Sequence, residues 1–157
     1  MYDSRQVANW FITCAVKDDR PLTIMVLVKL VYIAHGWHLA LRDKPLVSGP
    51  IEAWRHGPVV VDVYKTFRPK VKGNTITRPD KKFGTIRDPD DCFFLQKIYN
   101  SYTKKEAWEL SYLTHSAGGP WDVARNEMGL FVRIPDDLIR KHYLNMLQRA
   151  DQSEAMT

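Results

Sequence analysis

The chain has 157 residues, of which 45% are hydrophobic and 26% charged. This length fits one ordinary domain, and the composition excludes a wholly disordered protein. With 23 basic and 18 acidic residues the formal net charge is +5, which is compatible with nucleic acid or an acidic protein as partner and proves neither. The two cysteines, Cys14 and Cys92, are far apart in apolar helical contexts, so we expect buried thiols in a reducing compartment and no disulfide framework.

Neither export nor membrane insertion is expected. Residues 1–6 lack the basic and apolar regions of a signal peptide. Residues 22–41 have the length of a membrane span, but Lys29, His35 and His38 interrupt them, and a charge at mid-bilayer costs about 3 kcal/mol or more. We therefore expect a buried helix, a cytoplasmic protein and no membrane partner.

The first third of the chain predicts two helices. Residues 4–16 begin at Ser4, which can accept from first-turn amides, and repeat apolar side chains at helical spacing. Residues 18–21 break this pattern. Residues 23–41 predict a second helix that is apolar nearly all round, as the central helix of a bundle is, and residues 42–45 end it.

The middle of the chain predicts a short strand, a helix and a long loop. Residues 51–54 alternate like a half-buried strand. Pro58 suits the first position of a helix, and apolar side chains follow it at helical spacing as far as Phe67. Proline and glycine break residues 68–87 repeatedly, which predicts a loop whose one strand, residues 75–77, pairs with the earlier strand.

The following segment contains two helix-start signals. Asp88, followed by proline and two further acids, predicts the N-cap of a helix. Thr103 and Glu106 have the spacing of a capping box and predict the start of the next helix. Residues 118–120 close that helix, and Trp121 begins a short further turn.

Residues 134–137, Ile-Pro-Asp-Asp, open the last helix. We predict a mainly α (α+β) fold, a compact bundle of about six helices around the central apolar helix with a two- or three-stranded antiparallel β element. Residues 1–150 form a single domain, and residues 151–157 are expected to be a frayed polar tail.

The histidines offer a weak metal-site pattern. His35 and His38 are spaced i,i+3 on the predicted central helix, so both rings could reach one point. A zinc site needs further ligands, which His56, His115 or a cysteine would have to supply. Because neither Cys-x-x-Cys nor His-Glu-x-x-His occurs, we expect hydrogen-bonded structural histidines, no metal and no cofactor.

Patterns for catalysis are also missing. Both cysteines fall on apolar helix faces, where a thiolate is disfavoured. Ser116 follows His115, but no Gly-x-Ser-x-Gly elbow frames it, and Gly118-Gly119 precedes a proline instead of opening a phosphate loop. We therefore assign no catalytic residue and expect that the protein is not an enzyme.

Positive charge is concentrated in residues 65–87, which we call the basic loop. Eight basic residues and one acid give it a local charge of +7, so it could steer an acidic partner or contact phosphates. The alternative is a solvated loop that the lysines keep soluble. No helix-turn-helix, zinc-finger or RNP pattern supports sequence-specific nucleic-acid recognition. The basic residues are Lys65, Arg68, Lys70, Lys72, Arg78, Lys81, Lys82 and Arg87.

Two segments, residues 52–60 and 114–121, combine aromatic and imidazole side chains with rigid Gly-Pro turns. In one interpretation both are structural corners whose tryptophans fill the core. In the other they are adjacent walls of one partner-binding surface. The candidate partner-binding residues are Trp54, Arg55, His56, Tyr64, His115 and Trp121.

The same segments resemble the Panacea domain of SocA-like, often phage-associated antitoxins. The resemblance rests on residues 29–40 (KLVYIAHGWHLA), 51–60 (IEAWRHGPVV) and 110–115 (LSYLTH), followed by Pro120-Trp121 in the expected order. It implies an antitoxin that neutralises a cognate toxin, encoded by a neighbouring gene, through direct protein contact. It also implies a proteolytic adaptor that delivers the toxin to an ATP-dependent protease. No catalytic residues are assigned to the family.

Two other function classes stay open. A basic nucleic-acid-binding regulator would use the basic loop and bind DNA with a steep salt dependence. A metal-dependent enzyme would be built on His35, His38 and His115.

Overall fold

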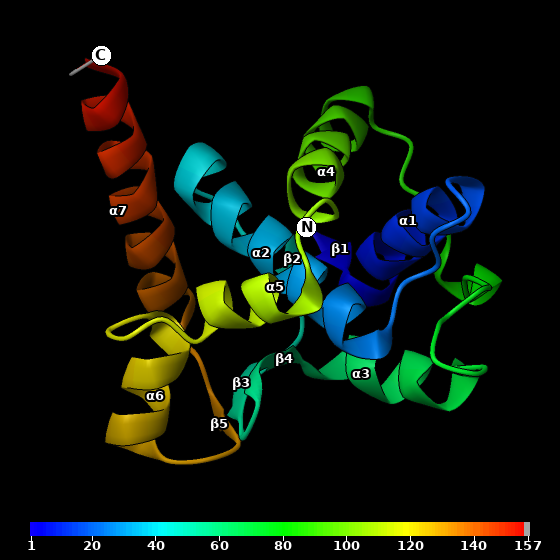
Figure 1. Ribbon diagram of the computed structural model, residues 1–157, viewed down its shortest axis with the longest axis horizontal. Coiled ribbons are helices and arrows are strands. Elements are labelled where there is room, and N and C mark those ends of the chain that lie inside the picture. The colour runs from blue at the N-terminus through cyan, green and yellow to red at the C-terminus, as the bar shows by residue number, and fades with distance from the viewer. Residues whose placement is uncertain (156–157) are drawn as a thin grey trace.

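The computed structural model describes residues 1–155 and shows helices arranged around α2 (Ile24–Arg42) (Figure 1). This central helix packs against helices from both halves of the chain and against the small sheet. The predicted mainly α class with a small antiparallel β element is confirmed. The other helices are α1 (Ser4–Lys17), α3 (Val61–Phe67), α4 (Pro89–Tyr102), α5 (Ala107–Thr114), α6 (Pro120–Met128) and α7 (Asp136–Ala155), with short 3-10 turns η1 (Arg68–Lys70) and η2 (Lys81–Phe83) between α3 and α4.

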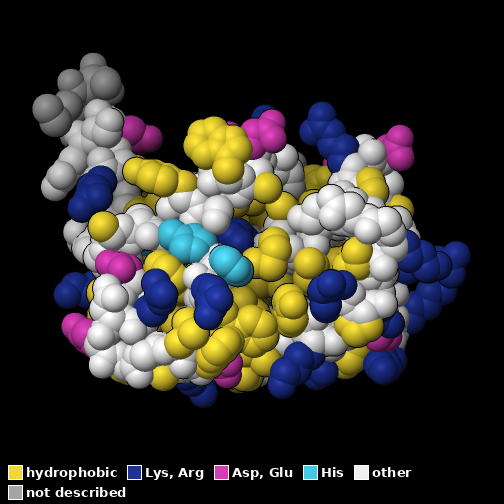
Figure 2. Space-filling model, turned by 60° about the horizontal axis from the view of Figure 1, so that its bottom comes forward, with side chains coloured by type: hydrophobic (Ala, Val, Ile, Leu, Met, Phe, Trp, Pro, Cys, Tyr) yellow, Lys and Arg dark blue, Asp and Glu magenta, His cyan; other side chains and the backbone are white. Residues whose placement is uncertain are grey.

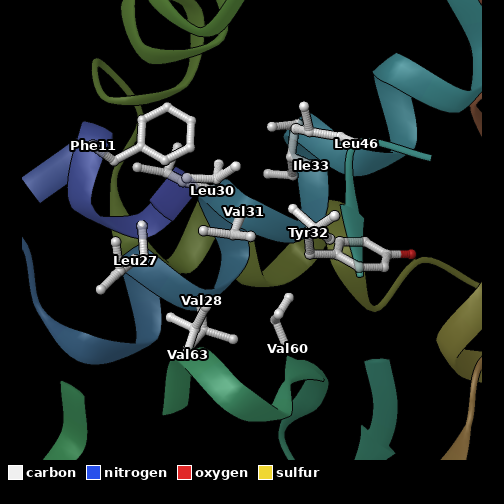
Figure 3. Packing of buried hydrophobic residues seen from close by; sticks show 14 of the residues in the cluster. Phe11, Leu27, Val28, Leu30, Val31, Tyr32, Ile33, Leu46, Val60 and Val63 are labelled. Carbon is white, nitrogen blue, oxygen red and sulfur yellow. The ribbon is translucent and has the colours of Figure 1, made fainter. Parts of the chain in front are cut away.

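The core forms around α2 because this helix is apolar nearly all round. From Leu27 to Leu39 every residue except Trp37 is buried. Figure 3 shows α2 side chains packed among residues of α1, α3 and the strands. By length and composition α2 could cross a membrane. However, 67% of its most apolar window is buried inside the fold, which agrees with the predicted buried helix.

A three-stranded antiparallel sheet lies against α2, in the order β4 (Gly57–Val60), β3 (Ile51–Trp54), β5 (Val132–Arg133). The register pairs Ile51 with Val60 and Ala53 with Val132. The helix predicted to start at Pro58 is therefore wrong in its first turn, because residues 57–60 form a strand and α3 follows. All four residues of β4 are buried, and β-branched valines suit a strand that a helix covers.

The strand predicted at residues 75–77 does not pair with β3. Ile76 instead forms an isolated antiparallel bridge with Leu22, ahead of α2, and β5 takes the place beside β3. A second, parallel pair joins β1 (Tyr2–Asp3) to β2 (Val47–Ser48).

Helix starts agree with the sequence where the capping chemistry is unambiguous. The Asp88 carboxylate accepts from the amides of Asp90 and Asp91, both at 3.0 Å. At α1 the cap is Asp3, which accepts from Arg5 N at 2.9 Å, while the predicted cap Ser4 is buried in the first turn.

The helix start predicted at Thr103 is also wrong. The Thr103 hydroxyl donates to the Tyr99 carbonyl and ends α4. The next helix, α5, begins four residues later, where the Glu109 carboxylate accepts from Glu106 N at 3.1 Å.

The last helix, α7, starts at Asp136 as predicted and packs along α2. It continues to Ala155, so residues 151–155 are helical in the segment that was expected to fray. Residues 156–157 of that expected tail lie outside the described part of the chain.

Candidate functional site

The six candidate partner-binding residues lie on four elements around one corner of the fold. Trp54 ends β3, and Arg55 and His56 form the exposed turn to β4. Tyr64 lies on α3. The remaining two, His115 and Trp121, come from the end of α5 and the first turn of α6.

A hydrogen bond and ring contacts join the two predicted segments directly. Trp121 Nε1 donates to the Trp54 carbonyl at 2.7 Å. The rings of Trp121 and His115 meet edge to face at 4.5 Å between centroids, and the rings of Trp54 and Tyr64 at 5.0 Å. Two segments about 60 residues apart in sequence therefore lie side by side at one corner of the fold. The hypothesis of a shared partner-binding surface needs this proximity.

These residues differ in exposure. Trp121 is only 7% exposed and belongs to the core. Trp54 is half-buried, and its Nε1 donates to the Glu52 carboxylate at 2.9 Å. The side chains of Arg55 and His56 are exposed at the hairpin tip. The corner thus combines a structural tryptophan with side chains that a partner can reach.

The His115 ring has a fixed orientation. Its Nδ1 lies 2.5 Å from the Ser111 carbonyl, and since a carbonyl only accepts, Nδ1 carries the proton and Nε2 is left as an acceptor. The Cε1 edge faces Gly57, where an added Cβ would lie 2.7 Å away. Gly57 has φ +126°, so both its backbone and its neighbour exclude a side chain.

The eight cations of the basic loop are all exposed. Two of them contact the one acid in the loop, since Lys70 Nζ and Lys82 Nζ lie 3.2 and 3.9 Å from Asp80 Oδ2. The loop therefore presents a positive surface, although part of it is neutralised internally.

His35 and His38 are hydrogen-bonded histidines, as expected, and their rings do not share a set of partners. His35 Nε2 donates to Asp136 Oδ1 at 2.9 Å, and its Nδ1 accepts from Val47 N at 3.3 Å. His38 Nδ1 donates to the Lys44 carbonyl at 2.5 Å. Each ring is thus held by a different element, and in residues 1–155 no group of three or more His, Cys, Asp or Glu could hold a metal ion.

Both cysteines are free, and they are half-buried where the sequence predicted buried thiols. Burial raises the pKa of the Cys14 thiol to about 11, which favours the unreactive protonated form.

Sequence reasoning missed an exposed hydrophobic row beside the corner. On α5, Trp108 is 70% and Tyr112 72% exposed; they are spaced i,i+4 and so share one side of the helix, opposite the buried Leu110 and Thr114. The i,i+4 spacing of Trp108 and Tyr112 was the sequence signal that could have predicted this exposed row.

A second exposed group lies at the end of α6 and in the turn after it. Met128, Leu130 and Phe131 are 46%, 37% and 57% exposed, and the Phe131 ring contacts Trp54 edge to face at 5.6 Å. Phe131 also has φ +62°, an uncommon conformation for a bulky residue. This turn therefore extends the corner outward with apolar side chains.

We call the combined surface the aromatic face. Figure 2 shows the side that carries the sheet in Figure 1, with hydrophobic side chains gathered around two histidines and several Lys and Arg side chains at their margin. Large exposed apolar patches of this kind mark interaction surfaces in soluble proteins. The aromatic face consists of Trp54, Tyr64, Trp108, Tyr112, His115 and Phe131.

Comparison with known proteins identifies the family. Residues 27–122 match the family described as Antitoxin SocA-like, Panacea domain. The chain is also 34% identical to Antitoxin SocA of Caulobacter vibrioides (strain NA1000 / CB15N), over 90% of this chain and 82% of that protein. The chain belongs to the SocA-like Panacea family. No solved structure matches it.

The Panacea match runs from within α2 to the first turn of α6. It therefore contains the hairpin, the basic loop and the α5 part of the aromatic face. In contrast α1, β5 and α7 lie outside it, and Phe131 with them.

Proposed function

We propose that this protein is an antitoxin that neutralises a cognate protein toxin by binding it through the aromatic face. Family membership supports the antitoxin role. The observation that carries the binding mode is the exposure of Trp108 and Tyr112, at 70% and 72%, beside a corner whose rings contact one another.

Physical reasons favour this surface as an interface. Trp and Tyr bury large areas and dominate binding energies in protein–protein interfaces. Trp54, Tyr64 and Phe131 form a packed ring cluster, so little side-chain entropy is lost when a partner covers them. Exposed Arg55 and His56 lie next to this cluster and supply polar contacts at its rim.

Four finer points belong to the same proposal. The toxin is encoded by a neighbouring gene, and both proteins act in the cytoplasm. The antitoxin also delivers its toxin to an ATP-dependent protease. In this step the surface of the antitoxin recognises the toxin. It acts by covering its partner and catalyses no reaction.

Alanine variants at the exposed positions test the interface. Trp108→Ala and Tyr112→Ala should each weaken toxin binding at least tenfold, because a hot-spot truncation removes about 2 kcal/mol or more. Stability should change by less than about 0.5 kcal/mol, since both side chains are exposed. Binding is measured by calorimetry with the neighbouring gene product, and neutralisation by growth on co-expression.

Phe93→Ala is the matched control, because Phe93 is 64% exposed but lies on α4, away from the aromatic face. It should bind and protect like the wild type. Equal binding by all three variants would remove the aromatic face as the interface. A neighbouring product that is harmless when expressed alone would contradict the antitoxin role itself.

A further inference from the structure

A groove of about 600 Å³ lies between α1 and the end of the basic loop, on the part of the fold where the chain from α3 to α4 passes α1 (Figure 1). It shares no residue with the aromatic face. The helix side includes Trp10, Thr13, Cys14 and Lys17, whose spacing of three and four places them on one helix face, together with the polar side chains of Gln6 and Asn9. Its volume falls in the range of small-molecule sites.

The loop side of the groove is fastened to the helix. Asn9 is 6% exposed, and both ends of its amide bind the loop backbone. Its Nδ2 donates to the Asp80 carbonyl at 2.7 Å, and Asp80 N donates to its Oδ1 at 2.8 Å. Ile86, 4% exposed, anchors the far end. The two walls are therefore held at a fixed separation before any ligand arrives.

The chemistry of the groove is apolar with a positive rim. Trp10 and Ile86 supply apolar surface, while Lys17 and Lys81 are exposed at the edges. None of the described residues that line the groove is acidic. The positive rim favours an anionic group and the apolar wall favours an apolar body, so both favour an organic anion.

The acids closest in sequence to the groove are engaged elsewhere. The Asp80 carboxylate faces Lys70 at 3.2 Å. The Asp18 carboxylate accepts from the Tyr99 hydroxyl at 2.7 Å. Lys17 and Lys81 are therefore the cations available to a ligand in the groove.

We propose that the groove binds a small organic anion. Its apolar, aromatic body lies against Trp10, and its carboxylate, sulfonate or phosphate pairs with Lys17 or Lys81. Binding of such an anion is a property separate from toxin recognition, since the two surfaces share no residue.

The test uses the full chain with two fluorescent probes that differ by one charge, anilinonaphthalene sulfonate and its uncharged analogue N-phenyl-1-naphthylamine. The sulfonate should bind with one-to-one stoichiometry. Lys81→Gln should weaken the sulfonate about fivefold to tenfold, as expected for loss of a charge-assisted contact, and leave the uncharged probe unchanged. Thr13→Trp, which fills the groove from an exposed position, should abolish binding of both.

Two further measurements locate the binding. Two control variants should bind the sulfonate as the wild type does. Val16→Trp changes an exposed residue of the same helix outside the groove, and Trp108→Ala changes the aromatic face. The bound sulfonate should also slow alkylation of Cys14 by a maleimide, because Cys14 lines the groove. Absence of binding, wild-type affinity in Thr13→Trp, or loss of affinity in Trp108→Ala would each overturn the proposal.

Discussion

At the scale of single residues, Lys29 is the least expected feature of the core. It lies in the middle of α2 and is 4% exposed. Burial lowers the pKa of its amine, and it makes no ion pair or hydrogen bond with any other residue in the described part of the chain. An amine without a partner that lies largely out of water destabilises the fold, because water solvates its charge less well than in the unfolded chain.

Replacing this amine should stabilise the protein. Lys29→Met should raise the free energy of unfolding at pH 7 by about 1 to 2 kcal/mol, since it keeps the chain length and removes the buried charge. The folded state holds the lysine proton less tightly than the unfolded state, so wild-type stability should rise as pH approaches the unfolded pKa near 10.4.

Urea denaturation at pH 7 and pH 9.5 measures both effects, and the gap between Lys29→Met and wild type should narrow at the higher pH. Lys141→Met, at an exposed position of α7, is the control and should change little. A less stable Lys29→Met protein would show that the amine contributes a favourable contact.

At the scale of elements, the packing of α2 on α7 depends on one glycine. A Cβ at Gly36 would lie 2.2 Å from Cε2 of Tyr143. The Tyr143 ring is buried against Trp37 and Tyr32, at 5.1 and 6.3 Å between centroids, so it has little room to move. The glycine disfavours the helix locally but allows the two helices to approach.

Gly36→Ala should therefore destabilise the protein by about 2 kcal/mol or more, although alanine is the better helix former by about 1 kcal/mol. In a Tyr143→Leu background the same substitution should be neutral or stabilising, because the ring is gone. Thermal unfolding of the four proteins gives the coupling energy. Additive effects would mean that the helices do not meet at this pair.

At the scale of the whole molecule, charge is distributed unevenly. The basic loop carries eight cations and one acid, or +7, so the rest of the chain sums to −2 within a total of +5. All eight cations are exposed. A separated positive surface of this kind accelerates encounter with an acidic partner and weakens with salt.

Reversing two loop charges should slow toxin association. Lys72→Glu with Arg78→Glu should lower the association rate constant about tenfold at low salt and change the dissociation rate much less. Stopped-flow mixing at two ionic strengths measures this, with Lys141→Glu as the control outside the loop. Unchanged association, together with DNA binding that falls steeply with salt, would instead assign the loop to nucleic acid.

Several elements could be predicted because their signals are local. Asp88 followed by proline, and the Ile-Pro-Asp-Asp start of α7, specify helix starts through their own backbone chemistry. The strand at residues 57–60 could not be assigned in this way, because Val59 and Val60 suit either structure. Pairing with β3 and burial against α2 decide the outcome.

The amino-acid sequence by itself determined the central helix, most helix starts, the clustered positive charge and the motifs that resemble the family, since each depends on neighbouring residues. Only the tertiary structure decided that Trp121 is buried. It is 7% exposed, and its Nε1 donates to the Trp54 carbonyl. This burial arises from contact between distant segments, which no local pattern encodes, whereas helical spacing already gave a signal for the exposure of Trp108.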